Sequence, residues 1–396
     1  MIRFEPFAAL RYAPGTDLDS VIAPPYDVLS DSDVDALEAR SPRNIVHVDV
    51  PRGGDDRYER AAATLAEWVE QGVMVRDEAP GFTLYRMRFT DDTGTERDLV
   101  GVLGALEVVD EGAGGVLPHE RTTKKASTDR LDLTRATHAN LSPVWGLSLA
   151  KGLTELLREP GEPLGSLCVE GVEHVIERVT DAERVAAIAA LVGSDDVLIA
   201  DGHHRYGVAR KYRDEQREAG AADANADGGG AGLTLTFVGE LVEEQLSIAA
   251  IHRLYHDISH ADLRAALERR FEITPAPAPS AEVLRQMEAD GRLALVAPDG
   301  SCEWLAPKPG AFDGVRALDG AWLEDALADV EHEVTYQHGV DEVVGVLADG
   351  GAQAAVLIRP VGISEIERTA REGLLMPPKS TFFTPKLRTG FVVRPL

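Results

Sequence analysis

The chain has 396 residues, and its 40 Lys and Arg against 67 Asp and Glu give a formal net charge of −27. A chain of this length folds into about two or three domains and buries a proper core. Because so acidic a surface repels phosphate backbones, we do not expect DNA, RNA or an anionic membrane as a general partner. Cys168 and Cys302 lie far apart, outside any CxxC or Cys/His cluster, which argues against a disulfide scaffold and a structural zinc site.

The N-terminal residues contain no apolar run of the roughly 7–15 residues that a signal peptide needs. No segment has the roughly 18–20 apolar residues of a membrane span either. We therefore expect a cytoplasmic protein with no membrane partner. Nothing in the sequence indicates its oligomeric state.

The first distinctive segment is 23–28 (APPYDV), a stiff proline-rich turn followed by a helix that Ser30 or Ser32 would cap. Tyr26 and Asp27 of this turn would either shape the rim of a pocket or serve the fold alone.

Hydrophobic periodicity predicts alternating strands and helices in the rest of the chain. We predict helices over residues 56–71, 129–140, 181–192 and 364–373, and one after the turn at 201–205. We predict strands over residues 44–50, 82–89, 99–109, 143–149, 172–179, 195–200, 233–241 and 353–360, of which 82–89 and 99–109 form a hairpin. Segment 220–232 is rich in Gly, Ala, Asn and Asp and is predicted to be a disordered surface loop. The pattern predicts an α+β, or mixed α/β, fold.

Positive charge gathers in three segments that are also rich in Gly, Pro, His, Ser and Thr. Residues 116–145 carry a net +2, residues 201–213 a net +3 and residues 377–396 a net +4, which leaves −36 on the rest of the chain. Three basic, turn-rich segments in an acidic chain predict convergence on a compact anion such as a nucleotide or phosphate. Chance fluctuation, with lysines that match helix dipoles, is the alternative.

The middle segment begins with Asp201-Gly202-His203-His204-Arg205, at the junction of a predicted strand and a predicted helix. A helix N-terminus offers free N–H groups to a phosphate, and Gly202 lets the backbone approach it. Arg205 can add a bidentate contact, and His203 and His204 can bind phosphate or transfer protons. Asp201 can cap the helix, hold Mg²⁺ or act as a base. The alternative is an ordinary cap with two exposed histidines.

The first basic segment contains PHERTTKK (118–125). Glu120, between His119 and Arg121, is a candidate general base whose pKa its cationic neighbours would set. Lys124 and Arg130 are candidates for phosphate contacts. A solvated loop before a helix is the alternative.

The third basic segment contains Lys379-Ser380-Thr381 and, further on, Lys386. Lys-Ser-Thr resembles the end of a P-loop, but the Gly-x-x-x-x-Gly that should precede the lysine is missing, so we exclude a Walker A site. These four residues would still line an anion pocket, unless the segment is a tail that simply packs on the body.

These motifs together resemble one family. APPYDV (23–28), PHERT (118–122) with TDRL (128–131), DGHHR (201–205) and PPKSTFFTPKL (377–387) occur in the order found in a large bacterial family catalogued as domain of unknown function ten-fifteen. The resemblance covers nearly the whole chain.

The DGHHR turn is also similar to the signature turn of the ParB/sulfiredoxin-like superfamily. Its members include the CTP-binding partition protein ParB, sulfiredoxin, and the free-serine kinases, which phosphorylate L-serine with ADP or ATP. The resemblance implies nucleotide phosphates at the turn and an upstream catalytic Glu, for which Glu120 is the candidate, with a long segment between it and Asp201. The turn lacks the cysteine of sulfiredoxin, and no basic helix-turn-helix follows it as in ParB.

With this resemblance, we expect a ParB/sulfiredoxin-like core with large insertions. The predicted regions are an N-terminal α/β region over 1–115, the core over 116–259, a helix-rich α/β insertion over 260–350, and a strand, helix and PPKST tail over 351–396 that returns to the core.

The expected function is a nucleotide-dependent phosphotransferase, a small-molecule kinase similar to the serine kinases, or a nucleotide hydrolase. Its substrate would be a small hydroxyl-bearing metabolite, and its cofactors ATP, ADP or CTP with Mg²⁺. The expected catalytic residues are Glu120, Asp201 and His204, with Asp201 also on the metal. The expected phosphate-binding residues are Gly202, His203, Arg205, His119, Arg121, Lys124, Lys379, Ser380 and Thr381. The alternatives are a non-catalytic nucleotide- or phosphometabolite-binding regulatory protein and a ParB-like nuclease.

Overall fold

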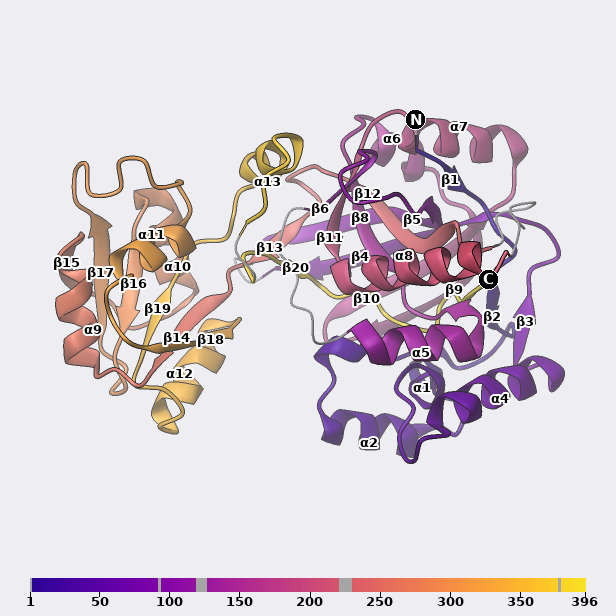
Figure 1. Cartoon of the computed structure of the whole chain (residues 1–396), viewed down its shortest axis with the longest axis horizontal. Coiled ribbons are helices and arrows are strands. Elements are labelled where there is room, and N and C mark those ends of the chain that lie inside the picture. The colour runs from indigo at the N-terminus through magenta and orange to yellow at the C-terminus, as the bar shows by residue number, and fades with distance from the viewer. Residues whose placement is uncertain (1, 92–93, 119–126, 221–229, 377–378) are drawn as a thin grey trace.

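Two β-sheets, each packed against helices, lie side by side in the computed structural model, which describes residues 2–91, 94–118, 127–220, 230–376 and 379–396 (Figure 1). One sheet has nine strands and mixed directions, and the other has six strands and is antiparallel throughout. The protein is thus an α+β protein, as the sequence predicts. Within the described ranges, no helix is both long and apolar enough to cross a membrane.

The nine-stranded sheet is built from strands between Phe4 and Glu240. Its order is β6 (Val116–Pro118), β11 (Val197–Asp201), β8 (Val144–Ser148), β12 (Leu233–Glu240), β5 (Glu96–Glu107), β4 (Phe82–Thr90), β10 (Val172–Val179) and β9 (Glu162–Val169), and β1 (Phe4–Glu5) also pairs with β5. β6 runs parallel to β11, and β12 runs parallel to β8. The hairpin predicted from 82–89 and 99–109 is confirmed as the antiparallel pair β4 and β5.

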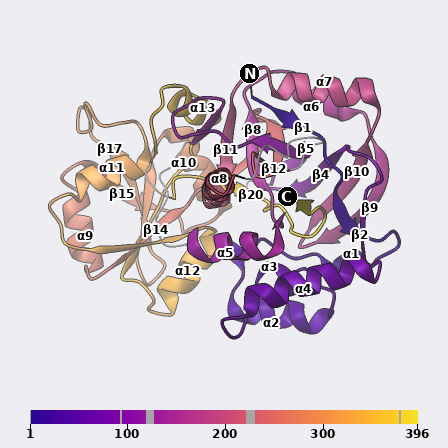
Figure 2. The same cartoon turned by 45° about the vertical axis from the view of Figure 1, so that its right-hand side comes forward.

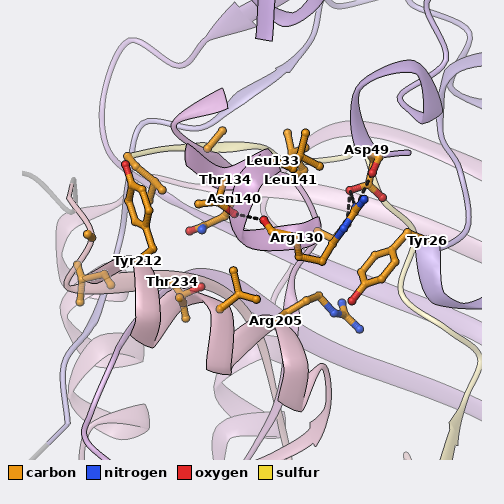
Figure 3. Close-up of a pocket in the computed structure, with 17 residues that line it drawn as sticks. Tyr26, Asp49, Arg130, Leu133, Thr134, Asn140, Leu141, Arg205, Tyr212 and Thr234 are labelled. Atoms are coloured by element: carbon orange, nitrogen blue, oxygen red, sulfur yellow. Dashed lines mark hydrogen bonds and ion pairs between the residues drawn. The ribbon is translucent and has the colours of Figure 1, made fainter. Parts of the chain in front are cut away.

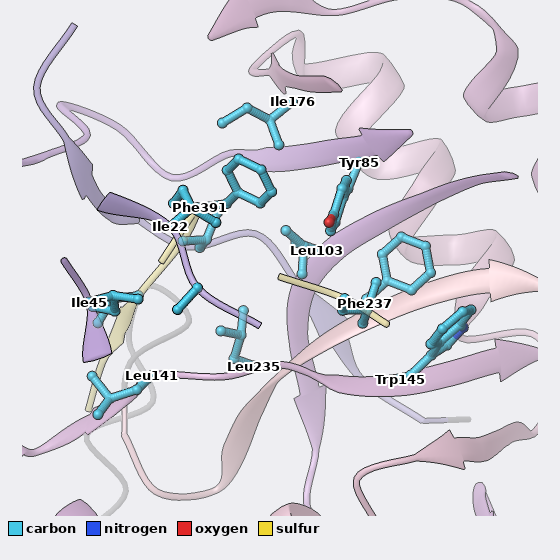
Figure 4. Close-up of a cluster of buried hydrophobic side chains, with 14 of the residues drawn as sticks. Ile22, Ile45, Tyr85, Leu103, Leu141, Trp145, Ile176, Leu235, Phe237 and Phe391 are labelled. Carbon is cyan, nitrogen blue, oxygen red and sulfur yellow. The ribbon is translucent and has the colours of Figure 1, made fainter. Parts of the chain in front are cut away.

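Alternation along β4 divides the core between the two faces of this sheet. Phe82 packs with α6 (Leu153–Arg158) and α7 (Ala182–Val192) on one face. Tyr85 packs on the other face with Trp145, Phe237 and Phe391 (Figure 4). Period-two alternation with apolar residues on both sides is typical of a strand that is buried on both faces.

The helices that cover the second face come from several parts of the chain. They are α1 (Leu18–Val21), the 3₁₀ helix Tyr26–Val28, α2 (Asp31–Arg40), α3 (Val46–Asp49), α4 (Arg57–Glu70) and α5 (Ser127–Thr137). α8 (His203–Glu218) instead packs on the first face, where Tyr206 and Ala209 join the cluster around Phe82. The predicted cap on α2 is confirmed, because Ser30 and Asp33 form a reciprocal capping box. α5 and α8 lie against each other in both views (Figure 1, Figure 2).

The strand predicted over 44–50 is wrong, because α3 occupies this segment. Ile45, Val46 and Val48 are all fully buried, so the segment is surrounded by core on every side. The side chain of Asn44 accepts a hydrogen bond from the Val46 amide at 3.0 Å and so begins the helical turn. β-Branched residues favour strands only when no tertiary contact overrides that preference.

The six-stranded sheet lies in the order β15 (Phe271–Ala276), β17 (Cys302–Pro307), β16 (Leu293–Val296), β19 (Ala354–Leu357), β14 (His252–His256) and β18 (Glu333–Gln337). Its helices are α9 (His260–Leu267), α10 (Ala281–Asp290), α11 (Asp319–Ala326) and α12 (Val340–Ala348). Buried apolar clusters lie around Leu305 and around Trp304, whose side chains point to opposite faces. The four-region division expected from the sequence stays a prediction, and strands on both sides of residue 115 share the larger sheet.

Three short strand pairs and one helix complete the fold. They are β2 (Leu10–Tyr12) with β3 (Met74–Arg76), β13 (Ser247–Ala249) with β20 (Phe382–Thr384), β7 (Ala139–Asn140) with β21 (Arg394–Pro395), and α13 (Ile363–Arg371). The last two pairs bring the C-terminal segment back to the larger body, where β20 contacts β11. The loop predicted over 220–232 falls largely outside the described residues.

Candidate functional site

The turn at 201–205 joins β11 to α8, as the sequence predicts. Gly202 is the N-cap of α8 with a φ of 84°, and its carbonyl accepts the Tyr206 amide at 3.0 Å. A Cβ at this position would lie 3.0 Å from Nε of Arg205. The left-handed conformation therefore favours glycine, and the space next to Arg205 is tight. Since glycine has no side chain, it cannot cap the first turn of α8, which keeps the partial positive charge of a helix N-terminus.

Arg205 connects this turn to the N-terminal motif. Its side chain is 9% exposed, its Nη1 donates to the carbonyl of Pro143, and its Nη2 lies 3.2 Å from Oδ2 of Asp201 and 3.8 Å from Oδ2 of Asp27. Its Nε is buried, and no group of the described residues accepts a hydrogen bond from it. The described contacts of Arg205 are therefore with the protein itself, and a phosphate contact by this residue stays a prediction.

Asp201 lies between two cations. Burial would raise its pKa, but the charges of Lys386, Arg205 and His203 outweigh burial and hold the pKa well below its usual range. The Nζ of Lys386 is 3.4 Å from the same Oδ2 that Arg205 contacts. Asp201 is thus a fixed anion at neutral pH, and it is a weak base.

The donor set around Asp201 does not form a metal site by itself. Its Oδ2 is shared by two cations, and the described part of the chain contains no group of three His, Cys, Asp or Glu side chains that could hold a metal ion. Mg²⁺ prefers several oxygen ligands in octahedral geometry. The described residues around Asp201 therefore do not fit a resident Mg²⁺.

A second cluster lies next to Arg205 (Figure 3). The guanidinium of Arg130 lies 4.4 Å from the centroid of the Tyr26 ring, and its Nη1 is 3.4 Å from Oδ1 of Asp49. Burial raises the pKa of Asp49, and Arg130 opposes this effect. Together with Arg205, these residues line a cavity of about 50 Å³, which has room for a few water molecules but not for a nucleotide. Arg130 is paired with buried Asp49, and its expected contact with a phosphate stays a prediction.

The third basic segment reaches the turn through Lys386. Lys379, by contrast, lies at the base of the six-stranded sheet, where its carbonyl accepts a hydrogen bond from Arg253 at 3.3 Å. Ser380 is buried next to it, and Thr381 leads into β20. Phosphate contacts by Lys379, Ser380 and Thr381 stay predictions.

The first basic segment enters the site through its strand. β6 pairs in parallel with β11, with Pro118 opposite Ile199, so Pro118 lies at the edge of the sheet where the turn lies. The expected site residues His119, Glu120, Arg121 and Lys124 lie outside the described residues.

A groove of about 720 Å³ runs past Lys386. Its lining includes Pro24 and Val28 of the N-terminal motif, Phe382 and Lys386 of the C-terminal motif, and His338 of the six-stranded sheet's body. The Nζ of Lys386 lies 4.1 Å from the centroid of the Phe382 ring, which stacks on His338 with centroids 4.4 Å apart. Two motifs from opposite ends of the sequence therefore share one groove next to the turn.

The sequence analysis did not identify two groups that contact the arginines of this site, namely the side chain of Asp49 and the carbonyl of Pro143. Asp49 is the last residue but one of the Val- and Ile-rich segment 44–50, and a carboxylate within such a segment signals a buried ion pair, because charged side chains are rarely buried unless they are paired. A backbone carbonyl carries no such signal.

Comparison with known proteins supports the family expected from the motifs. The family model described as "Protein of unknown function (DUF1015)" matches residues 4–321. No curated protein matches the chain in sequence.

Solved structures that resemble this one include a free serine kinase in complex with AMP, at 12% identity and a TM-score of 0.37, with 68% of this chain and 84% of that chain covered. A conserved hypothetical protein from Pyrococcus furiosus has the same identity and TM-score, with 71% and 92% covered. SbnI with a C-terminal truncation, from Staphylococcus aureus, also has 12% identity and a TM-score of 0.37, with 74% and 87% covered. At these values no activity is carried over to this chain. The family match, which spans most of the sequence, identifies the chain as a member of the family described as "Protein of unknown function (DUF1015)".

Proposed function

We propose that this protein is a nucleotide-dependent phosphotransferase or nucleotide hydrolase that acts on a small hydroxyl-bearing metabolite. In this proposal the turn at 201–205 binds the phosphates of ATP, ADP or CTP. The observation that carries it is the start of α8 at Gly202, with the Lys386 ammonium held next to it on Asp201.

The position of Lys386 supports phosphate binding here. Its side chain is 17% exposed, and its ammonium is attached through a flexible chain to a segment at the groove. A phosphate that reaches the turn would compete with Asp201 for this ammonium. Arg205, which is buried and contacts Pro143, would instead keep the turn in shape.

Phosphoryl transfer depends mainly on positioning and on neutralising the charge of the phosphates. The proposed base is Glu120, because the low pKa of Asp201 makes Asp201 a poor proton acceptor. His203, His204, His119, Arg121 and Lys124 would contact phosphates, with His204 next to the transferred group. Any Mg²⁺ would arrive with the nucleotide, whose phosphate oxygens supply most of its ligands.

A non-catalytic nucleotide- or phosphometabolite-binding regulator is the second candidate. It is favoured by the ion pairs of the described site, because Asp201, Asp27 and Asp49 are each paired with an arginine or a lysine. Such a site binds an anion without supplying a proton acceptor.

Calorimetry with ATP, ADP and CTP at millimolar concentration tests the common part of both proposals, and no binding to any of them would overturn both. We expect Lys386→Met to weaken binding about tenfold, since a charge-assisted contact contributes roughly 1.5–3 kcal/mol. The exposed Lys151 provides the control, and Lys151→Met should bind as the wild type does.

Turnover separates the two candidates. A Mg²⁺-dependent assay with a panel of amino acids and polyols should show nucleotide consumption that Glu120→Gln abolishes while binding remains. Tight binding with no turnover under any of these conditions would identify the regulator instead.

A further inference from the structure

We infer that the 720 Å³ groove next to the turn is the site for the aromatic base and sugar of the nucleotide. This inference rests on the proposed function, because it takes the turn at 201–205 as the site of the phosphates. It assigns a ligand to surfaces that come from three parts of the chain: the N-terminal motif, the C-terminal motif and the body of the six-stranded sheet.

The groove lies directly next to the turn at 201–205. Lys386 lies in the lining of the groove, and its Nζ is 3.4 Å from Oδ2 of Asp201 at the turn. Asp27, next to groove residue Val28, lies 3.8 Å from Arg205 of the same turn. The groove therefore begins where the phosphates would end, which is where a nucleotide carries its sugar and base.

Apolar and aromatic side chains line part of the groove. One wall consists of Pro24, Pro25 and Val28, and Val28 is 44% exposed although it is apolar. The lining also includes the half-buried ring of Phe382, stacked on His338 at an interplanar angle of 29°. Apolar side chains with aromatic rings are the surfaces on which planar bases stack.

The volume of the groove also suits a nucleoside. Sites for small molecules and cofactors have volumes of roughly 300–1,000 Å³ and apolar linings with a few polar groups. The groove falls within this range, whereas the cavity behind Arg205 measures only about 50 Å³. The groove has room for a nucleoside, and the cavity behind Arg205 does not.

The test compares ATP with inorganic tripolyphosphate, which carries the phosphates but no nucleoside. We expect the wild type to bind ATP about tenfold or more tightly than tripolyphosphate, because base stacking contributes roughly 1–3 kcal/mol per base. Val28→Trp, which fills the groove, and Phe382→Leu, which removes the ring but keeps its apolar bulk, should each weaken ATP about tenfold and leave tripolyphosphate unchanged.

The matched control is Val75→Trp, because Val75 is another exposed valine, at 37%, and does not line the groove. It should leave both affinities at the wild-type value. If ATP and tripolyphosphate bind equally well, or if neither groove variant changes the affinity for ATP, the groove assignment is wrong and the proposed function still stands. If neither compound binds, the proposed function fails, and this inference fails with it.

Discussion

Arg205 is the side chain on which two distant motifs depend. It contacts Asp201 of the strand end, Asp27 of the N-terminal turn and the carbonyl of Pro143, and it is almost entirely buried. A planar guanidinium serves three such partners at fixed angles, whereas an ammonium presents one point charge. Its role in the structure is therefore to hold the turn against residues 23–28.

We predict that Arg205→Lys lowers the free energy of unfolding by about 2–3 kcal/mol, because the shorter-reaching ammonium leaves buried partners unsatisfied. Urea denaturation measures this change. Arg217→Lys is the control on the same helix, since the Arg217 side chain is 60% exposed and its ion-pair partner, Asp214, is 3.9 Å away. The control should stay within about 0.5 kcal/mol of the wild type. Equal effects of the two substitutions would contradict the structural role of Arg205.

A second buried group, His174, makes stability depend on pH. The Tyr85 hydroxyl shares a hydrogen bond with its Nδ1 at 2.8 Å, and burial together with Arg388 lowers the pKa of His174 to about 4. The pKa of this histidine in the unfolded chain is about 6.5, so between about pH 6.5 and about pH 4 the unfolded chain binds a proton that the folded chain does not. The contribution of His174 to stability is therefore complete above about pH 6.5, falls as the pH decreases, and is fully lost below about pH 4.

For His174 this loss amounts to about 3 kcal/mol. We predict that His174→Phe, although less stable than the wild type at pH 7, loses less stability between pH 7 and pH 4.5. Urea denaturation across this range measures both slopes. The variant keeps some slope because burial also lowers the pKa of His252 to about 4. Identical slopes would show that His174 is protonated equally in both states.

At the scale of elements, the turn before α8 is the most constrained position. We predict that Gly202→Ala destabilises the protein by about 1–2 kcal/mol, because alanine must adopt a φ of 84° and its Cβ meets Arg205 at 3.0 Å. Phosphate binding should weaken with it. Gly207→Ala lies further along the same helix, where an added Cβ meets nothing within 4 Å.

Gly207→Ala is the matched control, and it should instead stabilise the protein by about 0.5–1 kcal/mol, because alanine is more favourable than glycine in a helix interior. Thermal unfolding of both variants decides the matter. A neutral Gly202→Ala would mean that the turn relaxes easily and is not a preformed site.

Most elements could be predicted from the sequence because their signals are local. β4 with β5, the capped α2 and the strand–turn–helix at 201–205 each follow from periodicity or from a cap residue within a few positions. α3 could not be predicted, because the burial of its β-branched residues on all sides comes from tertiary packing. The same limit applies to the site. The DGHHR residues were recognisable, but the pairing of Asp201 with Lys386 joins positions far apart in the sequence, and no local pattern encodes it.

At the scale of the molecule, each of the three basic segments places a described cation in the region around the turn. These cations are Arg130, Arg205 and Lys386, and each pairs with a carboxylate: Asp49 with Arg130, and Asp201 with the other two. The acidic chain thus compensates its own basic segments. A phosphate would therefore compete with Asp201 for cations that are already paired. We expect the affinity for phosphate to fall as the salt concentration rises, because salt screens these charges.

The two sheets have separate buried clusters, so we predict that they lose stability separately. Leu305 is fully buried in the six-stranded sheet's body and Leu235 in the nine-stranded sheet. Each Leu→Ala change should cost about 2–5 kcal/mol through the cavity it leaves. Hydrogen exchange should then accelerate mainly in residues 252–357 for Leu305→Ala, and mainly in the strands between residues 4 and 240 for Leu235→Ala.

Nucleotide binding adds a second readout to the same pair of variants. Leu305→Ala should retain binding of phosphates at the turn, because Asp201, Arg205 and Lys386 all belong to the body of the nine-stranded sheet. Leu305→Ala should weaken only the part of the nucleotide affinity that depends on His338, because His338 belongs to the same six-stranded body as Leu305. Faster exchange throughout the chain in both variants would instead mean that the two sheets unfold as one cooperative unit, with the stacked His338 and Phe382 among the contacts that couple them.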